Sequence, residues 1–481
     1  MAMSSDFATI PAECLDRLTS LLGAKGCKLG QDAQRYCDDP RGRFSGQLAI
    51  VLLPASTMQV SEIVKICAAF KVGIIPYGGG TGVVAGQLSP HNPNAVILSL
   101  EKMNRVRSIN LDEGVMVVEA GCILERIHQV AADHEMDFPL SMASKGSCTI
   151  GGNLATNAGG IQVVRHGNAR DLCLGIEAVL PNGDILNELS PLRKNNTGYD
   201  LRHLLIGAEG TLGVITAATL KIIPQPAVKV TAMLAVSSPS EALAVYRDLG
   251  ATLGPEITAL ELMSSLGLHI VRRHFPSLAA PFSAEHPWFL LIETAGASGL
   301  KERMEACLEQ TFEKGLVLDA IVAQSEAQRD GLWDLRELTP EANKAEGAFC
   351  NSDTAVPIAQ IAPFIRDTQA ALEELHSGIR VNSYGHIGDG NIHHNVFPPE
   401  GISKAEFVIQ HPEMVEDVRQ AINHVTVRYD GAISAEHGIG RLKINDLEAH
   451  ASKAKLHLLR AIKQAIDPDN IMNPGAMVRL D

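Results

Sequence analysis

Several features that would place a chain in a common protein class are missing from this sequence. Its nine cysteines are irregularly spaced and include no Cys-x-x-Cys pair, which argues against a disulfide framework, a zinc knuckle and an iron–sulfur cluster. No apolar run approaches the length of about 18 residues that spans a membrane. The first residues also lack the basic and apolar segments of a secretory signal. These absences predict a cytoplasmic protein without a membrane span.

Basic residues are in the minority. Lys and Arg number 41 against 55 Asp and Glu, so the formal net charge is −14. An acidic excess of this size disfavours nucleic acids and anionic membrane surfaces as partners. An anionic substrate would therefore need a local basic pocket. Hydrophobic residues make up 46% of the 481 positions, which is ordinary for a globular protein of two to four domains.

The order of strands and helices predicts a mixed architecture. A short buried strand over 49–54 precedes a helix over 61–70, with Ser61 as its N-cap, and a second strand covers 73–76. This β-α-β order predicts a parallel strand pair joined by a crossover helix. Further strands are expected at 95–100, 115–120, 176–180 and 213–223, and further helices at 124–134 and 454–466.

Proline marks the main predicted domain boundary. Pro224-Gln225-Pro226 closes the first run of strands, and a new alternating strand over 227–237 and a new helix over 239–250 follow. The final helix stops at Asp467-Pro468, because proline disfavours helix in the residue before it. The chain is therefore divided into segments 1–45, 46–226, 227–455 and 456–481.

A histidine-flanked turn is the most distinctive motif. The run is His386-Ile387-Gly388-Asp389-Gly390-Asn391-Ile392-His393, and Asp-Gly between such flanks is a strong hairpin signal. With Asp389 and Gly390 at the two turn positions, His386 lies directly opposite His393. Directly opposed side chains share one face of the sheet, with Cβ atoms about 5 Å apart. At that spacing two imidazoles can hold one cation.

A carboxylate further along the chain is the candidate third ligand. Glu436 lies in Ser434-Ala435-Glu436-His437-Gly438. Two histidines and one carboxylate with an open fourth position describe a catalytic rather than a structural metal site. A polar hairpin without a metal is the alternative reading of the histidine pair, and for the pair alone it is the favoured one. A flavin-free metal hydrolase that uses water as its nucleophile is a further alternative.

Three glycine-rich segments suggest a large ligand lying against the backbone. The first, 76–82, follows a strand directly, and its glycines would let backbone N–H groups approach a pyrophosphate. It fits neither the Walker A pattern nor Gly-x-Gly-x-x-Gly. The others cover 145–160 and 207–213. Each could be an ordinary turn, but three together favour a cofactor site.

With these motifs the chain resembles the flavoprotein superfamily named after vanillyl-alcohol oxidase and p-cresol methylhydroxylase. Within it, the chain resembles the FAD-dependent D-2-hydroxy acid dehydrogenases, a group that includes D-lactate dehydrogenase, D-2-hydroxyglutarate dehydrogenase and the glycolate oxidase flavin subunit. The resemblance runs from about residue 40 to the end. It is carried by the segments 76–82, 146–160, 206–216, 386–393, 436–440 and 467–475.

The resemblance implies an α+β fold. It assigns 46–226 to a two-lobed FAD-binding domain of the p-cresol methylhydroxylase type, preceded by the helical segment 1–45. It assigns 227–455 to an α+β substrate domain that caps the flavin, and 456–481 to a tail that returns to the FAD domain.

The resemblance also implies the cofactor contacts. The expected FAD-binding residues are Gly78, Gly79, Gly80, Thr81, Gly82, Ser147, Gly151, Asn153, Thr156, Gly159, Gly160, Ile215 and Asn473. Members with covalently attached flavin carry a histidine in the first glycine loop. This chain has none there, so noncovalent FAD is expected.

In the metal-dependent branch of the family, the matching residues bind a divalent ion. The resemblance assigns His386, His393 and Glu436 as ligands, with zinc expected and manganese as the alternative ion. It makes His437 the general base. Because Glu436 and His437 are adjacent, a regular strand would point them apart, so a bent segment is expected. His394 should project to the opposite face from His393 and receives no role.

The expected reaction is oxidation of a D-2-hydroxy acid to the 2-oxo acid. Arg336 aligns with the arginine that binds the substrate carboxylate, although a surface charge is the alternative for any single arginine. Asn351 stands where D-2-hydroxyglutarate dehydrogenases carry a lysine, which favours a monocarboxylate such as D-lactate over D-2-hydroxyglutarate.

The partners are expected from the same resemblance. Electrons should pass to electron-transfer flavoprotein, a quinone or a cytochrome, and a homodimer is one expected assembly. The chain could instead be the flavin subunit of a multi-protein oxidase of the glycolate oxidase kind.

Overall fold

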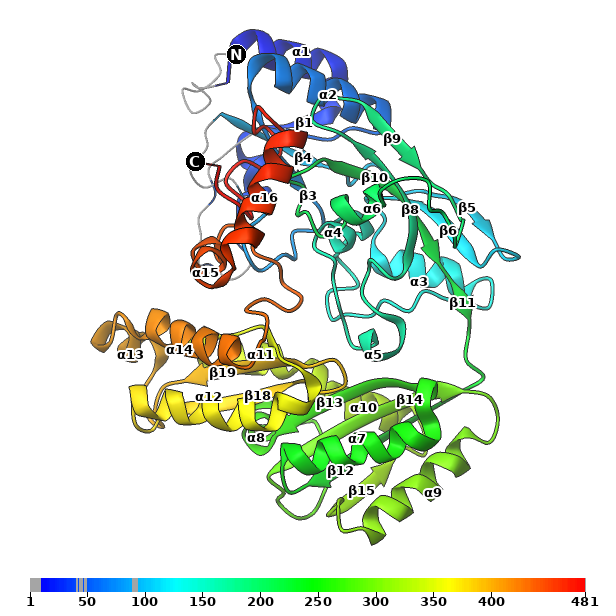
Figure 1. Ribbon diagram of the computed structural model, residues 1–481, viewed down its shortest axis with the longest axis vertical. Helices are drawn as coiled ribbons and strands as arrows, with labels where there is room; N and C mark the ends of the chain where they lie inside the picture. The colour runs from blue at the N-terminus through cyan, green and yellow to red at the C-terminus, as the bar shows by residue number, and fades with distance from the viewer. Residues whose placement is uncertain (1–9, 40–41, 43–45, 47–49, 89–93, 481) are drawn as a thin grey trace. The chain divides into compact units, whose positions relative to one another are not determined.

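The computed structural model describes residues 10–39, 42, 46, 50–88 and 94–480 (Figure 1). The chain forms two compact units. The first contains Met1–Gly160, Gly167–Gln225 and Glu436–Asp481, and the second contains Ile161–His166 and Pro226–Ala435. None of the helices in the described part of the chain combines the length and apolar character needed to cross a bilayer.

The first sheet of the first unit has the strand order β1-β2-β4-β3. These strands are β1 (Cys27–Lys28), β2 (Val51–Leu52), β4 (Ala95–Ser99) and β3 (Gly73–Tyr77). Strands β2 and β3 both run parallel to β4. The predicted β-α-β unit is present, but β4 separates the two strands that the sequence had suggested as a pair.

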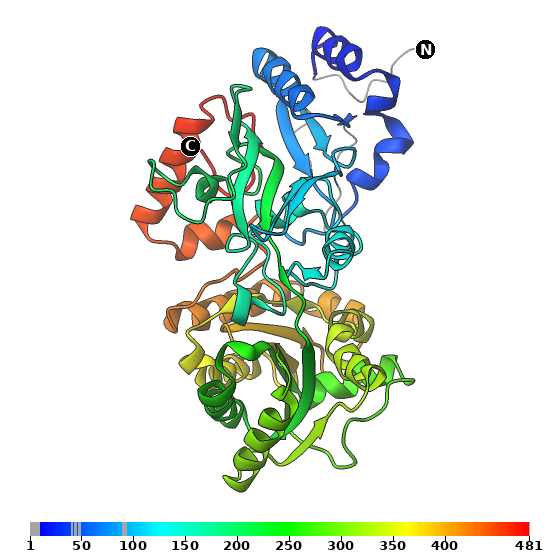
Figure 2. The same ribbon diagram turned by 90° about the vertical axis from the view of Figure 1, so that its right-hand side faces the viewer.

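Helix α2 (Thr57–Phe70) makes the crossover between β2 and β3. It begins earlier than predicted, because the extended residue Ser56 caps it and accepts a hydrogen bond from the backbone N–H of Gln59. Ser61, the predicted cap, lies inside the helix and donates its hydroxyl to the carbonyl of Gly183. Helix α1 (Ala12–Leu22) packs against α2, and Figures 1 and 2 show the two side by side.

The second sheet is antiparallel, with the order β5-β6-β10-β8-β9. Helices α3 (Leu124–Ala132) and α4 (Ile150–Ala155) share its apolar core. The short helix α6 (Leu201–Leu205) and the pair β7 (Met136–Asp137) and β11 (Ile223–Pro224) belong to the same unit. The strands are β5 (Val106–Asn110), β6 (Val115–Glu119), β8 (Cys173–Val179), β9 (Ile185–Glu188) and β10 (Val214–Lys221).

The end of the chain belongs to the first unit. Helices α15 (Ile444–His450) and α16 (Lys453–Ile466) lead to Met472, which forms a parallel bridge with Ile74. The buried Lys463 ammonium donates to the carbonyls of Thr211 and Met472. The second unit therefore ends at Ala435, twenty residues before the predicted boundary at 455, because 436–455 is held by residues of the first unit.

The second unit is built on an antiparallel sheet of order β15-β12-β14-β13-β18-β19-β16, with β17 also pairing with β19. Successive side chains along each strand point to opposite faces of the sheet. The residues of a strand are therefore divided between two apolar cores, one on each face. The strands are β12 (Val228–Val236), β13 (Ile257–Ser264), β14 (Trp288–Gly296), β15 (Asp319–Val322), β16 (Cys350–Asn351), β17 (Thr354–Ala355), β18 (Arg380–His386) and β19 (Asn391–Phe397).

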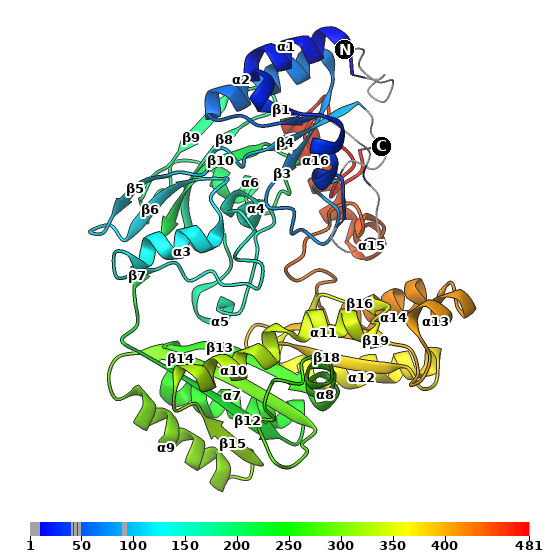
Figure 3. The ribbon, with the colours of Figure 1, turned by 180° about the vertical axis from the view of Figure 1, so that it is seen from behind.

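Helices cover both faces of this sheet. On one face α7 (Pro239–Leu253), α9 (Leu300–Glu313) and α12 (Ile361–Leu375) pack around residues such as Leu260 and Leu262. On the other, α8 (Ser265–His274), α10 (Glu326–Glu337) and α11 (Thr339–Glu346) pack around Ala259 and Met263. Figures 1 and 3 view the sheet from these two sides. The remaining helices are α5 (Val163–His166), α13 (Lys404–Gln410) and α14 (Met414–Arg428).

Candidate functional site

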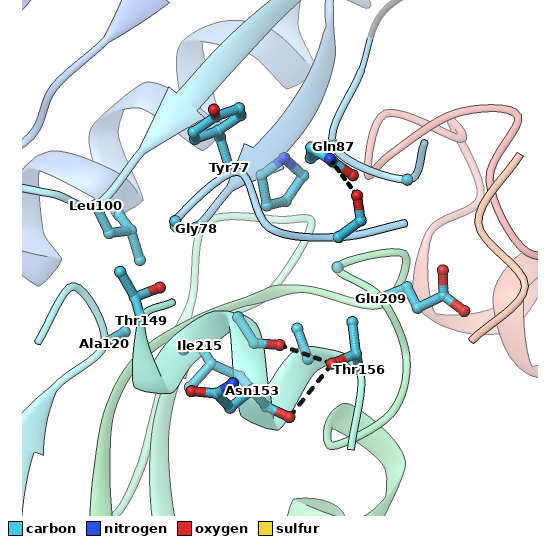
Figure 4. A pocket seen from close by; sticks show the side chains of 18 of the residues that line it. Tyr77, Gly78, Gln87, Leu100, Ala120, Thr149, Asn153, Thr156, Glu209 and Ile215 are labelled. Carbon is cyan, nitrogen blue, oxygen red and sulfur yellow. Dashed lines mark hydrogen bonds between the residues drawn. The ribbon is translucent and has the colours of Figure 1, made fainter. Parts of the chain in front are cut away.

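A cavity opens in the first unit between the glycine-rich segments. Figure 4 shows Gly78 on one side of it, and on the other Asn153, from α4, and Thr156, which directly follows α4. Most of the predicted FAD contacts line it, whereas Ser147, Gly159 and Gly160 do not. The predicted residues in its wall are Gly78, Gly79, Gly80, Thr81, Gly82, Gly151, Asn153, Thr156, Ile215 and Asn473.

The first glycine loop touches the second so closely that side chains are excluded. A Cβ atom on Gly79 would lie 2.0 Å from the carbonyl oxygen of Ser147, and one on Gly78 would lie 2.9 Å from Thr149 Oγ1. Gly80 has φ +75°, a backbone angle that residues other than glycine rarely adopt. The glycines therefore bring backbone to the cavity surface, where its N–H groups can bind an anion.

Asn153 places an unsatisfied acceptor at the cavity. The residue is buried, and its Nδ2 donates to Met142 Sδ at 3.3 Å. Among the described residues, no group donates to its buried Oδ1. A buried polar atom without a partner is costly, so this oxygen marks a position where a ligand donor would fit.

Glu209, which the sequence did not single out, also lines the cavity. Its two carboxylate oxygens accept hydrogen bonds of 2.7 Å from the backbone N–H groups of Ile439 and Gly440. Burial raises the pKa of Glu209, and these two N–H groups partly oppose that shift. The only sequence signal was its place inside the third glycine-rich segment.

The segment held by Glu209 carries two predicted site residues. His437 lines the cavity, and its Nε2 lies 3.9 Å from Glu436 Oε1. Gly438 and Gly440 both have positive φ, so the backbone bends as predicted. Adjacent side chains can therefore approach each other here, which a regular strand would not allow.

The histidine hairpin of the second unit has a different register from the predicted one. His386 lies opposite Asn391, and His393 lies opposite Tyr384. The prediction of a tight two-residue turn at Asp389-Gly390 is therefore wrong, because residues 387–390 all belong to the loop. Such a turn needs positive φ at both central residues, and of the two only Gly390 has it.

The two histidines still lie close together. A residue two positions from the cross-strand partner points to the same face, so His386 and His393 are diagonal neighbours. Their ring centroids are 5.9 Å apart, and both residues are buried. The predicted proximity is therefore present, although by a diagonal contact rather than a direct one.

Glu261 joins the histidine pair to the predicted substrate arginine. Its Oε1 lies 2.5 Å from His386 Nδ1, and its Oε2 accepts a 2.7 Å hydrogen bond from Arg336 Nε. Burial acts to raise the pKa of Glu261, but the charges of Arg336 and His386 lower it to about 2. The available sequence signal was a lone acidic residue in the apolar strand β13.

Tyr384 completes this polar cluster. The guanidinium carbon of Arg336 lies 4.9 Å from the centre of the Tyr384 ring, a cation–π contact. The same ring is 5.3 Å from that of His393. Arg336 is buried rather than a surface charge, and it lies with both histidines in one cluster on the face of the sheet that carries Met263.

His394 lies on the opposite face, as predicted. It pairs with Ser383, whose Oγ is 2.9 Å from His394 Nδ1. Burial lowers the pKa of His394 to about 3, so the ring is neutral near pH 7. Asn351, at the position of the missing lysine, lies opposite Asn395 and so shares the face of His393.

Glu436 follows the second unit directly in the chain. The backbone N–H of Ala435 donates to the carbonyl of Asp353 at 3.3 Å. The Asp353 carboxylate in turn accepts from Ser434 Oγ and from Asn391 Nδ2. The residue before Glu436 is thus attached to the hairpin strand β19 through Asp353 and Asn391.

Comparison with known proteins identifies two families along the chain. Residues 48–188 match the family described as "FAD binding domain", and residues 225–477 match "FAD linked oxidases, C-terminal domain".

Among curated relatives, a D-2-hydroxyglutarate dehydrogenase of Xanthomonas citri pv. viticola is 36% identical, covering 93% of this chain and 92% of its own. The mitochondrial D-2-hydroxyglutarate dehydrogenase of Bos taurus is 38% identical, over 90% of this chain and 77% of its own. A putative mitochondrial D-lactate dehydrogenase of Schizosaccharomyces pombe is 34% identical, covering 92% of this chain and 84% of its own.

Solved structures share the fold at low sequence identity. A substrate-bound p-cresol methylhydroxylase has a TM-score of 0.74 at 16% identity, covering 98% of this chain and 97% of its own. A 4-ethylphenol oxidase from Gulosibacter chungangensis has a TM-score of 0.73 at 18% identity, covering 98% of both chains. These findings confirm the resemblance and the α+β fold class, and the chain belongs to the FAD-linked oxidase family, with a fold of the p-cresol methylhydroxylase type.

Proposed function

We propose that this FAD-linked oxidoreductase oxidises a D-2-hydroxy acid to the 2-oxo acid, with FAD bound in the cavity of the first unit. The observation that carries the proposal is the buried cluster in which Glu261 joins Arg336 to His386. It puts a carboxylate-binding side chain beside a pair of metal-binding side chains. A 2-hydroxy acid presents the matching groups, a carboxylate next to a hydroxyl.

The residues around the cavity fit FAD. The glycines expose backbone N–H groups for a pyrophosphate, and Asn153 Oδ1 offers an acceptor that a hydroxyl or N–H of the cofactor could satisfy. When bound, FAD supplies the acceptor for the hydride that leaves the substrate Cα. No histidine lies in the first glycine loop, so we propose that the flavin is noncovalent.

The donor set of His386, His393 and Glu436 fits a divalent metal. Two imidazoles and one carboxylate are ligands of catalytic zinc, and manganese is the alternative ion. A bound metal would supply Lewis acidity that lowers the pKa of the substrate hydroxyl.

Protein side chains bind the substrate carboxylate and accept the hydroxyl proton. Arg336 binds the substrate carboxylate, since its planar guanidinium matches two carboxylate oxygens. His437, which lines the FAD cavity, accepts the hydroxyl proton because imidazole titrates near neutral pH.

For the substrate we propose a monocarboxylate such as D-lactate, because the neutral Asn351 cannot form an ion pair with a second carboxylate. D-2-hydroxyglutarate is the alternative, favoured by the names of most of the similar curated relatives. The relative kcat/KM of the wild-type protein for D-lactate and D-2-hydroxyglutarate decides between them, and an Asn351→Lys variant tests the role assigned to this position. If the position faces the far end of the substrate, lysine should raise kcat/KM for the diacid at least tenfold, whereas the neutral control Asn351→Gln should not.

The electron acceptor, the cellular location and the assembly of the protein are also part of the proposal. No nicotinamide fingerprint occurs in the sequence, so electrons would pass to electron-transfer flavoprotein, a quinone or a cytochrome. We expect a cytoplasmic protein and a homodimer. A flavin subunit that works only within a multi-protein oxidase is the alternative, whereas membership of the FAD-linked oxidase family removes the flavin-free hydrolase.

A dye-linked assay of the purified chain tests the proposed function. The D-enantiomer of a 2-hydroxy acid should reduce the dye, and the L-enantiomer should not. Removal of divalent ions with EDTA should abolish the activity, and zinc or manganese should restore it. Full activity after complete metal removal would refute the metal site. A yellow protein that reduces dye only with added partner proteins would favour the multi-protein alternative.

A further inference from the structure

We infer that Glu261 is a positioning residue that orients the proposed metal ligand His386 and the proposed substrate-binding Arg336 together. The inference deepens the proposed function and rests on it. Glu261 is completely buried in β13, directly opposite His386 on β18. Paired residues of adjacent strands share a face, so the register itself brings the carboxylate to the imidazole.

A carboxylate at this position is expensive to bury. Leu260 and Leu262, its neighbours along β13, are fully packed in the apolar core of the other face. A buried carboxylate is tolerated only with hydrogen-bonding partners of opposite charge or good donors. Its two partners, the Arg336 guanidinium and the His386 imidazole, offset this cost.

The contact with His386 determines which ring nitrogen carries hydrogen. An ionised carboxylate is only an acceptor, and its Oε1 faces His386 Nδ1. Nδ1 must therefore carry the hydrogen. In a neutral imidazole the lone pair then lies on Nε2, which is the atom that a metal needs.

The contact with Arg336 orients the guanidinium group. Nε donates to Glu261 Oε2, and the guanidinium lies over the Tyr384 ring. The hydrogen bond and the ring contact together fix the orientation of the guanidinium plane. The donors on Nη1 and Nη2 form the opposite edge of the guanidinium, which is the edge suited to a carboxylate.

The two contacts cannot be kept by an amide. Both partners of Glu261 donate, whereas a glutamine side chain has one acceptor oxygen and one donor nitrogen. In Glu261→Gln, either Arg336 loses its acceptor or His386 faces an NH₂ group, which favours the tautomer with hydrogen on Nε2. Glu261→Asp retains two acceptor oxygens but is shorter by one methylene.

Zinc affinity is the primary test because it does not depend on turnover. Metal-free full-length protein is titrated with zinc against a chromophoric chelator, with Glu261→Gln compared to Glu293→Gln. Glu293 is a matched control: it is buried on the neighbouring strand β14 and accepts from Trp333 Nε1. We expect a zinc Kd at least tenfold higher in Glu261→Gln, an intermediate value in Glu261→Asp and an unchanged value in Glu293→Gln.

Kinetics separate the two contacts. With saturating zinc, kcat of Glu261→Gln should recover while the KM for the hydroxy acid remains raised, because zinc cannot restore the orientation of Arg336. Wild-type zinc affinity and KM in Glu261→Gln would overturn the inference. Absence of zinc binding by the wild-type protein would instead overturn the metal site and the role of Glu261 toward His386. If Glu261→Gln does not fold, Glu261→Asp with wild-type zinc affinity and KM would likewise overturn it.

Discussion

The carboxylate of Glu209 accepts a 2.7 Å hydrogen bond from the backbone N–H of Gly440, across 231 residues of sequence. Its other oxygen accepts from the N–H of Ile439. These bonds attach the segment that carries His437 to the wall of the proposed FAD cavity. One buried side chain thus ties the proposed base to the cofactor site.

Replacing Glu209 with glutamine should weaken FAD binding. The amide retains one acceptor, so one of the two backbone N–H groups loses its bond, at a cost of about 1.5–3 kcal/mol. We expect the FAD dissociation constant to rise about tenfold or more, measured by fluorescence titration of apoprotein. The exposed Glu188→Gln is the control. Equal FAD affinity in both variants would contradict the assigned role.

Gly79→Ala should abolish FAD retention. The new Cβ would meet the carbonyl oxygen of Ser147 at 2.0 Å, so the two glycine loops must separate. The ratio of flavin to protein absorbance after purification measures the effect. Gly331→Ala, in α10, is the matched control, because nothing lies within 4 Å of its added Cβ. It should retain the flavin and stabilise the fold by about 0.5–1 kcal/mol. A yellow Gly79→Ala protein would disprove the close approach.

Glu177→Gln should destabilise the first unit in a pH-dependent way. Its Oε1 accepts from Arg107, Thr57 and Thr216. Glutamine keeps an acceptor oxygen for these donors but removes the negative charge that pairs with Arg107, which should cost about 1 kcal/mol at pH 7. Burial acts to raise the pKa of Glu177, but its donors lower it overall from the ordinary 4.5. A lowered folded-state pKa gives stability that is present above 4.5 and is lost as the pH falls through the folded-state value.

Urea denaturation at pH 7 and at pH 3.5 checks the direction of this pH dependence of stability. The difference in midpoint between wild type and Glu177→Gln should shrink on acidification, because the wild-type carboxylate becomes protonated. Glu62→Gln, an exposed change on α2, should have little effect at either pH. A difference that grows at low pH would contradict the pKa direction.

Cys27 should be the first cysteine to react with iodoacetamide. It is half-buried, whereas the other eight are buried. Burial raises the pKa of Cys27 too, but it raises the pKa of Cys173 and Cys350 to about 12, so reactive thiolates at those two positions are scarce at pH 8. Peptide mass spectrometry after a short labelling pulse measures the order. Early labelling of Cys350 in the folded protein would contradict the burial, and urea should make all nine react.

Local patterns were enough to predict many elements of the fold. The helix over 239–250 corresponds to α7, and the strand over 115–120 corresponds to β6. Propensity, capping residues and hydrophobic period act over a few residues, so they are readable directly from the chain. The position of β4 between β2 and β3 was not readable, because strand order depends on contacts between distant segments.

The sequence by itself determined the glycine loops, the histidine hairpin and the family, because each depends on residue types at short spacing. Only the tertiary structure decided the hairpin register and placed Glu261 between Arg336 and His386. Glu261 and His386 are 125 residues apart in the chain. Their contact follows from the pairing of β13 with β18, and Arg336 reaches the same carboxylate only because α10 packs on that face. Such pairings are set by the burial of whole faces of a sheet, which no local pattern specifies.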